Sequence, residues 1–266
     1  MVNKTLNILI IGATGSIGKH VTAIAVNAGH RVRVLLRKTS HDEMLPEQVQ
    51  KYYGDVTQPE TLGDALKGIE AVVFTLGTHG QGKLGAQAVD YGGVRNVLMA
   101  LRGRAVRVAL MTTIGVTERK GVWNQRTQLH DWKRCSERLL RASGQVYTIV
   151  RPGWFDYNQP DEHRLILLQG DRRHSGTPQD GVIARKQIAE VLVASLTSQA
   201  AMNKSFELVA ERGPAQHELE PLFAALKSDQ HDALDGVEDL NNMPLAEEPV
   251  SVQMELQNLS ALRNKP

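Results

Sequence analysis

The sequence has little of several features that would assign it to a special class of protein. It has a single cysteine, Cys135, which excludes an internal disulfide and fits a reducing compartment. Its 31 basic and 29 acidic residues nearly cancel, so charge gives no argument for a nucleic-acid or membrane partner. No basic-then-apolar leader precedes Leu6, and no run approaches the roughly 20 apolar residues of a membrane span. We therefore expect a cytoplasmic protein that binds neither nucleic acid nor membranes, and we predict no metal site.

The overall composition is that of an ordinary soluble domain. Of the 266 residues, 41% are hydrophobic and 23% are charged, which is typical of a globular protein with a sizeable core. This length allows one large α/β domain plus an appendage, at roughly 150 residues per domain.

Three glycines near the amino terminus form the strongest motif. The apolar run 7–11 indicates a buried strand, Gly12, Gly15 and Gly18 follow it at a spacing of three, and the pattern then becomes helical. Such glycines allow a tight turn, close approach of the backbone to a pyrophosphate, and close packing of helix on strand. The helix N-terminus then offers free N–H groups to phosphates. The motif therefore predicts a dinucleotide site, the alternative being a plain strand-to-helix turn.

The ends of the next three predicted strands supply further candidate cofactor contacts, and the first of them bears on which dinucleotide is bound. NAD sites carry an acidic residue about 20 positions beyond the glycines, whereas an arginine there accommodates the 2′-phosphate of NADP. This chain has Arg37, which favours NADP over NAD; the alternative is a solvated basic pair. Asp55 ends the third strand, where it can bind the adenine amine or merely start a turn. Gly77 and Thr78 end the fourth strand and should run beside the cofactor.

The remaining pattern alternates strands and helices and predicts a doubly wound parallel sheet of the Rossmann type. We expect strands at residues 7–11, 31–36, 48–53, 71–76, 106–111, 147–153, 165–171, 181–184 and 205–209. We expect helices at 19–28, 60–67, 85–101, 130–143, 185–196 and 214–226. Charged residues of the helix at 130–143 should form salt bridges on an exposed face.

The chain beyond the predicted sheet changes in composition. Residues 229–250 hold seven acidic residues and no lysine or arginine, which indicates a solvated linker or flexible arm. A short helical pattern follows, which can dock on its own domain or on a neighbouring subunit, so a homodimer stays open. We predict a dinucleotide-binding domain at 1–228, including substrate-side segments at about 153–183, and an acidic linker with a helical tail at 229–266.

Taken together, these motifs resemble the short-chain dehydrogenase/reductase superfamily, in particular its atypical NAD(P)-binding branch of Tic62-like and NmrA-like proteins. The resemblance covers residues 6 to about 226, and it rests on the glycine turn, Asp55 with Val56, Lys133 with Glu137, and the run 141–153. It implies a small-molecule oxidoreductase in which a Ser or Thr after the fifth strand polarises the substrate carbonyl.

The resemblance also implies that a Tyr donates the proton and that a Lys four residues later holds the nicotinamide ribose. Thr112 or Thr113 matches the first role and Lys133 the last, but the Tyr position carries Leu129. A leucine cannot act as a general acid. Any proton must then come from water or from another group, for which Tyr157, His130 and Thr113 are the candidates.

Aromatic residues gather where this family builds its substrate wall. The chain has only 5% aromatic residues, yet Trp154, Phe155 and Tyr157 fall within four positions. This cluster indicates an apolar pocket or a packed loop. His79 and the run 172–174 are further loop positions that can meet a ligand, although such residues are usually solvated.

Three functions remain open at this stage: an NADP-dependent oxidoreductase on an unidentified small molecule, a non-catalytic NADP(H)-binding redox sensor or scaffold, and, more weakly, an epimerase or dehydratase. The catalytic residues that we predict are Thr113, Lys133 and Tyr157. The cofactor-binding residues that we predict are Gly12, Thr14, Gly15, Ser16, Ile17, Gly18, Arg37, Asp55, Val56, Gly77, Thr78, Lys133, Pro152 and Gly153.

Overall fold

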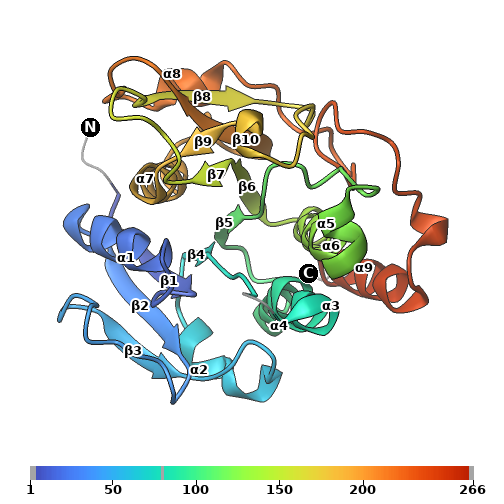
Figure 1. Ribbon diagram of the computed structural model, residues 1–266. Helices are drawn as coiled ribbons and strands as arrows, with labels where there is room; N and C mark the ends of the chain where they lie inside the picture. The colour runs from blue at the N-terminus through green and yellow to red at the C-terminus, as the bar shows by residue number, and fades with distance from the viewer. Residues whose placement is uncertain (1–3, 79–80, 264–266) are drawn as a thin grey trace.

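A run of parallel strands forms the centre of the molecule in the computed structural model, which describes residues 4–78 and 81–263 (Figure 1). Within these residues the sheet order is β3-β2-β1-β4-β5-β6-β10, and every neighbouring pair in that run is parallel. Strands β8 and β9 pair antiparallel with β10, and β7 joins β9. The doubly wound parallel sheet is therefore confirmed.

The strands are β1 (Asn7–Ile11), β2 (Arg31–Leu36), β3 (Gln50–Tyr53), β4 (Ala71–Phe74), β5 (Arg107–Met111), β6 (Val146–Pro152), β7 (Trp154–Phe155), β8 (Arg164–Leu168), β9 (Val182–Ile183) and β10 (Lys204–Glu211). The α-helices are α1 (Gly18–Asn27), α2 (Gly63–Leu66), α3 (Gly82–Gly85), α4 (Gly92–Leu101), α5 (Val122–Thr127), α6 (Leu129–Ala142), α7 (Arg185–Ser195), α8 (Glu220–Ala224) and α9 (Val250–Arg263). A π-helical stretch η2 (Ala86–Tyr91) joins α3 to α4, and short 3₁₀ turns are η1 (Pro59–Thr61), η3 (Pro178–Asp180) and η4 (Leu245–Glu247).

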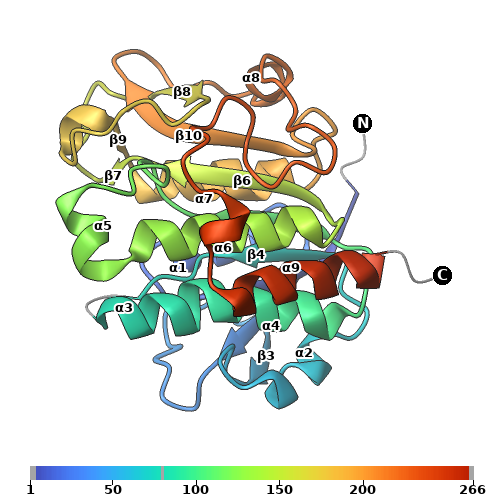
Figure 2. The same ribbon diagram turned by 90° about the vertical axis from the view of Figure 1, so that its right-hand side faces the viewer.

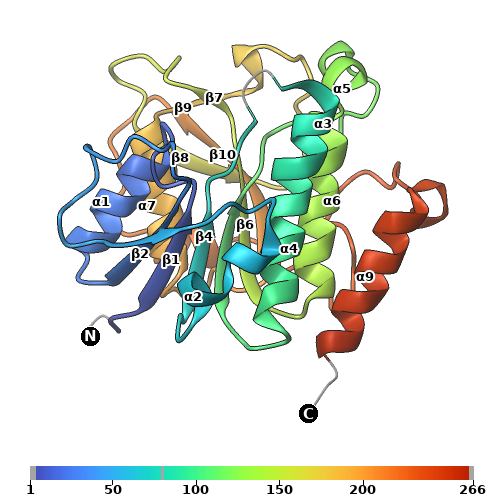
Figure 3. The same ribbon diagram turned by 90° about the horizontal axis from the view of Figure 1, so that it is seen from below.

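The sheet has one apolar core on each face, because successive side chains of a strand point to opposite sides. Ile8 and Ile10 of β1 join the core under α1 and α7, whereas Leu9 and Ile11 join the core under α4 and α6. All four side chains are at most 1% exposed. Figure 3 shows the two helical layers on either side of the sheet, an arrangement that explains why β1 reads as an unbroken apolar run.

The C-terminal helix α9 forms a further layer outside α4 and α6 (Figure 2). Its buried side chains Val252, Leu256 and Leu259 belong to the same apolar core as those two helices. Of the two docking sites that the sequence left open, α9 therefore occupies the one on its own domain.

The charged face of α6 is buried, which corrects the expectation that it would be exposed. Every residue of α6 from Lys133 to Ala142 is buried. The arginines of this face pair with the acidic segment before α9: Arg134 and Arg138 contact Asp235, and Arg141 contacts Asp229. The solvated linker that the charge pattern indicated is thus packed against α6 at these positions.

Three predicted helices differ from the structure. The helix expected at 60–67 is divided into the 3₁₀ turn η1 and the four residues of α2. The helix expected at 214–226 is reduced to the five residues of α8, because the side chain of Gln216 bonds both backbone groups of Leu165 and holds that segment along β8. The helix expected at 85–101 begins at Gly82 and contains the π-helical stretch η2. Among the described residues, none of the helices is both long and apolar enough to cross a membrane.

Candidate functional site

The turn between β1 and α1 has the backbone geometry of a phosphate-binding loop. Gly12 has a φ of 89°, and a Cβ there would lie 2.9 Å from the carbonyl oxygen of Thr75. A Cβ at Gly18 would lie 2.0 Å from the Gly12 carbonyl oxygen, so the helix packs directly on the turn. At Gly15 an added Cβ would meet only that same oxygen among the described residues, which leaves the outer side of the turn open. These are the three roles that glycines have in a dinucleotide turn.

The helix that follows the turn is prepared for an anion. Thr14, Gly15 and Ser16 are exposed, whereas Ile17 and Gly18 are buried. The first turn of α1 carries no acidic side chain, and its N-cap residue Ile17 makes no side-chain cap. The N–H groups of Lys19 and His20 already donate to the carbonyl oxygens of Gly15 and Ile17, at 3.1 and 2.9 Å, so an external acceptor such as a phosphate would meet the exposed amides of the turn before them. The turn and the helix together fit the diphosphate of a dinucleotide.

Arg37 lies at the same edge of the sheet as this turn. The register sets Ile11 of β1 opposite Leu35 of β2, so Arg37 follows its strand beside the turn. Its side chain is exposed, and within residues 4–78 and 81–263 it makes no ion pair. The first carboxylate after it, Asp42, is paired instead with Lys51 at 2.8 Å. Arg37 therefore keeps its charge available at the cofactor edge.

Asp55 and Val56 already have partners within the chain. The Asp55 carboxylate accepts hydrogen bonds from the backbone N–H and the hydroxyl of Thr57, at 2.8 and 2.7 Å. The Val56 carbonyl accepts one from the side-chain amide of Asn96 at 2.7 Å. The turn-forming role of Asp55 is thus present, and its contact with adenine stays a prediction.

Lys133 takes part in a buried cluster with Asp90 and Thr78. Its ammonium lies 2.7 Å from one Asp90 oxygen, and the two side chains are 8% and 1% exposed. The other Asp90 oxygen accepts the Thr78 hydroxyl at 2.6 Å. Asp90 belongs to the π-helical stretch η2, a feature that is frequent at functional sites. The cluster joins the loop after β4, where Gly77 is exposed, to α6. His79 lies outside the described residues.

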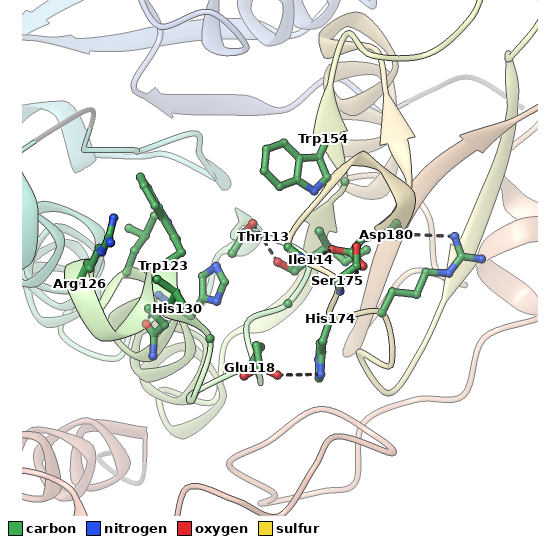
Figure 4. Close-up of a pocket in the computed structure, with 18 of the residues that line it drawn as sticks. Thr113, Ile114, Glu118, Trp123, Arg126, His130, Trp154, His174, Ser175 and Asp180 are labelled. Carbon is green, nitrogen blue, oxygen red and sulfur yellow. Dashed lines mark hydrogen bonds and ion pairs between the residues drawn. The ribbon is translucent and has the colours of Figure 1, made fainter.

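A pocket of about 690 Å³ opens at the carboxyl ends of β5 and β6 (Figure 4). Thr113 follows β5 and Gly153 follows β6, and both line it together with Leu129. The other lining residues come from the loop after β5, from α5 and α6, from β7 and from the loop before β9: Ile114, Gly115, Glu118, Gly121, Val122, Trp123, Asn124, Arg126, His130, Trp154, Phe155, Arg173, His174, Ser175, Gly176 and Asp180. The structure thus gathers one threonine, the leucine at the tyrosine position and an aromatic wall.

The other residues predicted for catalysis lie differently. Thr112 donates its hydroxyl to Glu137 at 2.7 Å in the interior, which leaves Thr113 as the threonine at the pocket. Tyr157 is 59% exposed and is not among the lining residues; its ring packs edge-on against Trp154, with 6.2 Å between the centroids. Pro152 is buried at the end of β6. The aromatic cluster therefore contributes Trp154 and Phe155 to the pocket wall.

Two histidines of the pocket differ in charge. Burial lowers the pKa of His130, whose Nδ1 is buried without a hydrogen-bond partner in the described part of the chain. The hydrogen bond to Asp171 raises the pKa of His174, whose Nδ1 also lies 3.3 Å from the Glu118 carboxylate. His130 is thus a neutral ring at neutral pH, whereas His174 is held toward its cationic form.

Asp171 ties the loop before β9 to the loop after β5. Its carboxylate accepts hydrogen bonds from the N–H groups of Gly115 and Thr117, both at 2.7 Å. Burial opposes its ionisation, but the His174 hydrogen bond, the Arg151 charge and these backbone donors together lower the pKa of Asp171 to about 2. This ionised carboxylate fixes the two loops that carry one side of the pocket.

Sequence reasoning missed Asp90, Glu118, Trp123 and Asp171. Trp123 had a usable signal, because it is one of only three tryptophans and it follows the fifth strand. Asp90 also had one, since it is a carboxylate within the apolar stripe of a predicted core helix. Glu118 and Asp171 are 53 positions apart and meet at His174 only through the fold.

Comparison with known proteins agrees with this geometry. Residues 12–199 match the model of a family described as NAD(P)H-binding. The chain is 26% identical over 222 residues to the "Uncharacterized sugar epimerase YhfK" of Bacillus subtilis, covering 82% of this chain and 100% of that protein. It is 25% identical to the sanguinarine reductase of Eschscholzia californica, covering 84% and 96%.

A solved structure shows the same fold. The oxidoreductase ylbE of Lactococcus lactis superposes with a TM-score of 0.64 at 18% identity, over 86% of this chain and 99% of that one. The family match extends from the glycine turn past the pocket to the end of α7. The chain therefore belongs to the NAD(P)H-binding family of atypical short-chain dehydrogenases/reductases, the branch of the Tic62-like and NmrA-like proteins.

Proposed function

We propose that this protein is an NADPH-dependent oxidoreductase that reduces a small apolar molecule. The observation that carries the proposal is the position of the pocket, which opens at the carboxyl ends of β5 and β6, the same sheet edge at which the glycine turn lies. In open α/β sheets, ligands bind outside the carboxyl ends of the strands. A cofactor on the turn and a substrate in the pocket would therefore share one edge.

The chain's own residues account for cofactor binding. The exposed amides of the turn would bind the diphosphate, Arg37 the 2′-phosphate, and Lys133 the nicotinamide ribose. Asp90 positions Lys133, because its carboxylate fixes the ammonium from a buried site. When bound, the reduced nicotinamide supplies a hydride. The preference for NADPH over NADH rests on Arg37. The first carboxylates after it, Asp42 and Glu43, come too late in the chain to take the position of the acidic residue of NAD sites.

The pocket residues suit reduction of a substrate held against Thr113. The Thr113 hydroxyl donates to the Ile114 carbonyl at 3.1 Å and can turn to a substrate oxygen. Leu129 lines the pocket with an apolar side chain and supplies no proton. The similarity to the sanguinarine reductase supports a reductase, whereas the similarity to a sugar epimerase supports the epimerase function named in the sequence analysis.

A non-catalytic NADPH sensor is the second candidate. Leu129 favours it, because the usual proton donor is missing. The two candidates share the cofactor site and differ in turnover.

Cofactor titration of the full chain followed by a substrate panel tests both candidates. We expect NADPH to bind more tightly than NADH, and we expect turnover on at least one carbonyl or quinone. Tight NADPH binding without turnover would favour the sensor. Gly12→Val should abolish binding, since valine is strained at a φ of 89° and would meet Thr75. Gly63→Ala is the matched control, because an added Cβ there has open space. If Gly12→Val binds NADPH normally, both candidates fail.

A further inference from the structure

The last helix of the chain contacts the part of the fold that carries Asp90. Helix α9 packs against α4 and α6 (Figure 2), and it lies beyond the matched residues 12–199. One carboxylate oxygen of Glu255 on α9 lies 2.7 Å from the guanidinium of Arg95 on α4, and the other accepts the hydroxyl of Tyr91. Tyr91 is the last residue of the π-helical stretch η2 and follows Asp90 directly. An ion pair and a hydrogen bond thus join α9 to the region that holds Asp90.

Tyr91 connects α9 to α6 from a buried position. The residue is 3% exposed, and its ring packs against Trp132, the residue before Lys133, with 5.1 Å between the centroids. Burial and the hydrogen bond to Glu255 raise the pKa of Tyr91, so its hydroxyl stays protonated and donates. A buried hydroxyl needs an acceptor, and Glu255 supplies it. The side chain of Tyr91 is therefore held by its ring and by its hydroxyl.

The position of the Asp90 carboxylate depends on the π-helical geometry of η2. A π-helical turn is rare, and it closes its hydrogen bonds over five residues instead of four. A change of this stretch to α-helical geometry would turn Asp90 about the helix axis relative to Lys133 and Thr78, which it contacts at 2.7 and 2.6 Å. The contacts that hold Tyr91 in place therefore also hold Asp90 against Lys133.

We propose that Glu255 is a positioning residue of the cofactor site, which acts on Lys133 through Tyr91 and Asp90. This inference rests on the proposed function, in which Lys133 binds the nicotinamide ribose. The Glu255 carboxylate fixes Tyr91 and the start of α4, η2 keeps its geometry, and Asp90 sets the ammonium of Lys133. The C-terminal helix thus contributes to NADPH binding as well as to the apolar core.

Binding of NADPH and of 2′,5′-ADP to the full chain separates positioning from general stabilisation. The second compound is the adenosine half of NADPH with its 2′-phosphate, and it lacks the nicotinamide and the ribose that Lys133 would bind. We expect Glu255→Ala to raise the Kd of NADPH roughly fivefold, through partial loss of a hydrogen bond to a charged group. The Kd of 2′,5′-ADP should stay unchanged. Nucleotide fluorescence measures the first constant and calorimetry the second.

Three further variants separate the hydrogen bond from other effects of the substitution. Tyr91→Phe removes only the hydroxyl and keeps the ring against Trp132, so it should weaken NADPH binding in the same direction even if Glu255→Ala fails to fold. Glu255→Gln keeps an oxygen that can accept from Tyr91, so it should restore most of the affinity lost in Glu255→Ala. Gln257→Ala is the matched control, because Gln257 is exposed on α9 and its side chain makes no hydrogen bond within residues 4–78 and 81–263.

Each outcome of these titrations decides the inference. Loss of NADPH affinity with 2′,5′-ADP affinity intact in Glu255→Ala or Tyr91→Phe would support it. Unchanged NADPH affinity in both variants would overturn it and leave the proposed function intact. Equal losses of NADPH and 2′,5′-ADP affinity would also overturn it, because the effect would then be a general one. Failure of the unmodified chain to bind NADPH would defeat the proposed function, and this inference with it.

Discussion

Charge is used in opposite ways at the cofactor edge and beneath the C-terminal segment. At the end of β2, Arg37 and Lys38 are exposed and form no ion pair within the described residues. Beneath the C-terminal segment, Arg151 is 1% exposed and its guanidinium contacts Glu137 at 2.6 Å, Asp239 at 2.7 Å and Glu207 at 3.3 Å.

The difference follows from the cost of removing a charge from water. A buried arginine must have its partners within the fold, since an unpaired buried charge costs several kcal/mol. An exposed arginine has no such requirement, so its charge remains available to a ligand. Exposed basic side chains at the cofactor edge are therefore available to an external anion. The buried arginines of α6 instead pair with acidic residues of the same chain.

Removal of Arg151 should have the largest effect. Arg151→Met leaves Glu137 and Asp239 buried beside an apolar side chain, and we expect the free energy of unfolding to fall by about 3–5 kcal/mol. Urea denaturation at pH 7 measures this. The control is Arg164→Met, which breaks a pair with Glu211 whose side chains are 49% and 42% exposed and should cost at most about 1 kcal/mol. Equal losses in the two variants would contradict the comparison.

Reversal of charge at Arg37 should affect binding and leave folding unchanged. Arg37→Asp removes a charged contact worth about 1.5–3 kcal/mol and adds repulsion, so we expect the Kd of NADPH to rise at least tenfold. The Kd of NADH should change little, because NADH lacks the 2′-phosphate. Titration by nucleotide fluorescence measures both constants. The control is Arg102→Asp, at an exposed arginine that ends α4 at its C-terminus. Unchanged NADPH affinity would remove the argument for NADP.

The contacts of His174 with Asp171 and Glu118 should make a smaller, pH-dependent contribution to the free energy of unfolding. Because the folded-state pKa of His174 is raised, its stabilisation is fully present below the unfolded value of about 6.5 and is lost as pH rises through the folded value. At pH 6, His174→Gln should lower the free energy of unfolding by about 1 kcal/mol, and the difference from wild type should shrink toward pH 9. Denaturation curves across this range measure it, beside the exposed control His217→Gln. A difference that grows with pH would contradict the assignment.

The smallest effect is expected at Glu238, next to the buried Asp239. Glu238 pairs with Lys227 at the surface, with side chains 41% and 70% exposed, so Glu238→Gln should leave the urea midpoint unchanged. Asp239→Asn should lower that midpoint, since its 1% exposed carboxylate bonds Arg151 through both oxygens. If the two neighbouring substitutions behaved alike, burial would not be what separates these carboxylates.

Much of the fold could be predicted from local pattern. The apolar run before Gly12 predicts a parallel strand buried on both faces, and the structure has one. The ends of a helix differ from the prediction where a side chain bonds to the backbone of a distant part of the chain. Gln216 bonds the backbone of Leu165, 51 positions away, and prevents the helix that its local sequence favours.

The candidate site could be predicted only in part. Thr113, Leu129 and Gly153 follow from motif spacing, and they meet at one pocket. Trp123 and Asp90 carried a local signal in the sequence, but their roles at the site depend on α5 and η2 lying beside the strand ends. Tyr157 was placed near the pocket by sequence proximity to Trp154, yet its ring is largely exposed.

The sequence by itself determined the parallel sheet, the glycine turn, the arginine after β2 and the leucine in place of a tyrosine, because these depend on neighbours within a few positions. The tertiary structure decided which charges are buried. Arg134 meets Asp235 across 101 positions, and Arg151 meets Asp239 across 88. Helical spacing shows that charges share a face, but whether that face meets water or an acidic segment depends on where a distant part of the chain packs.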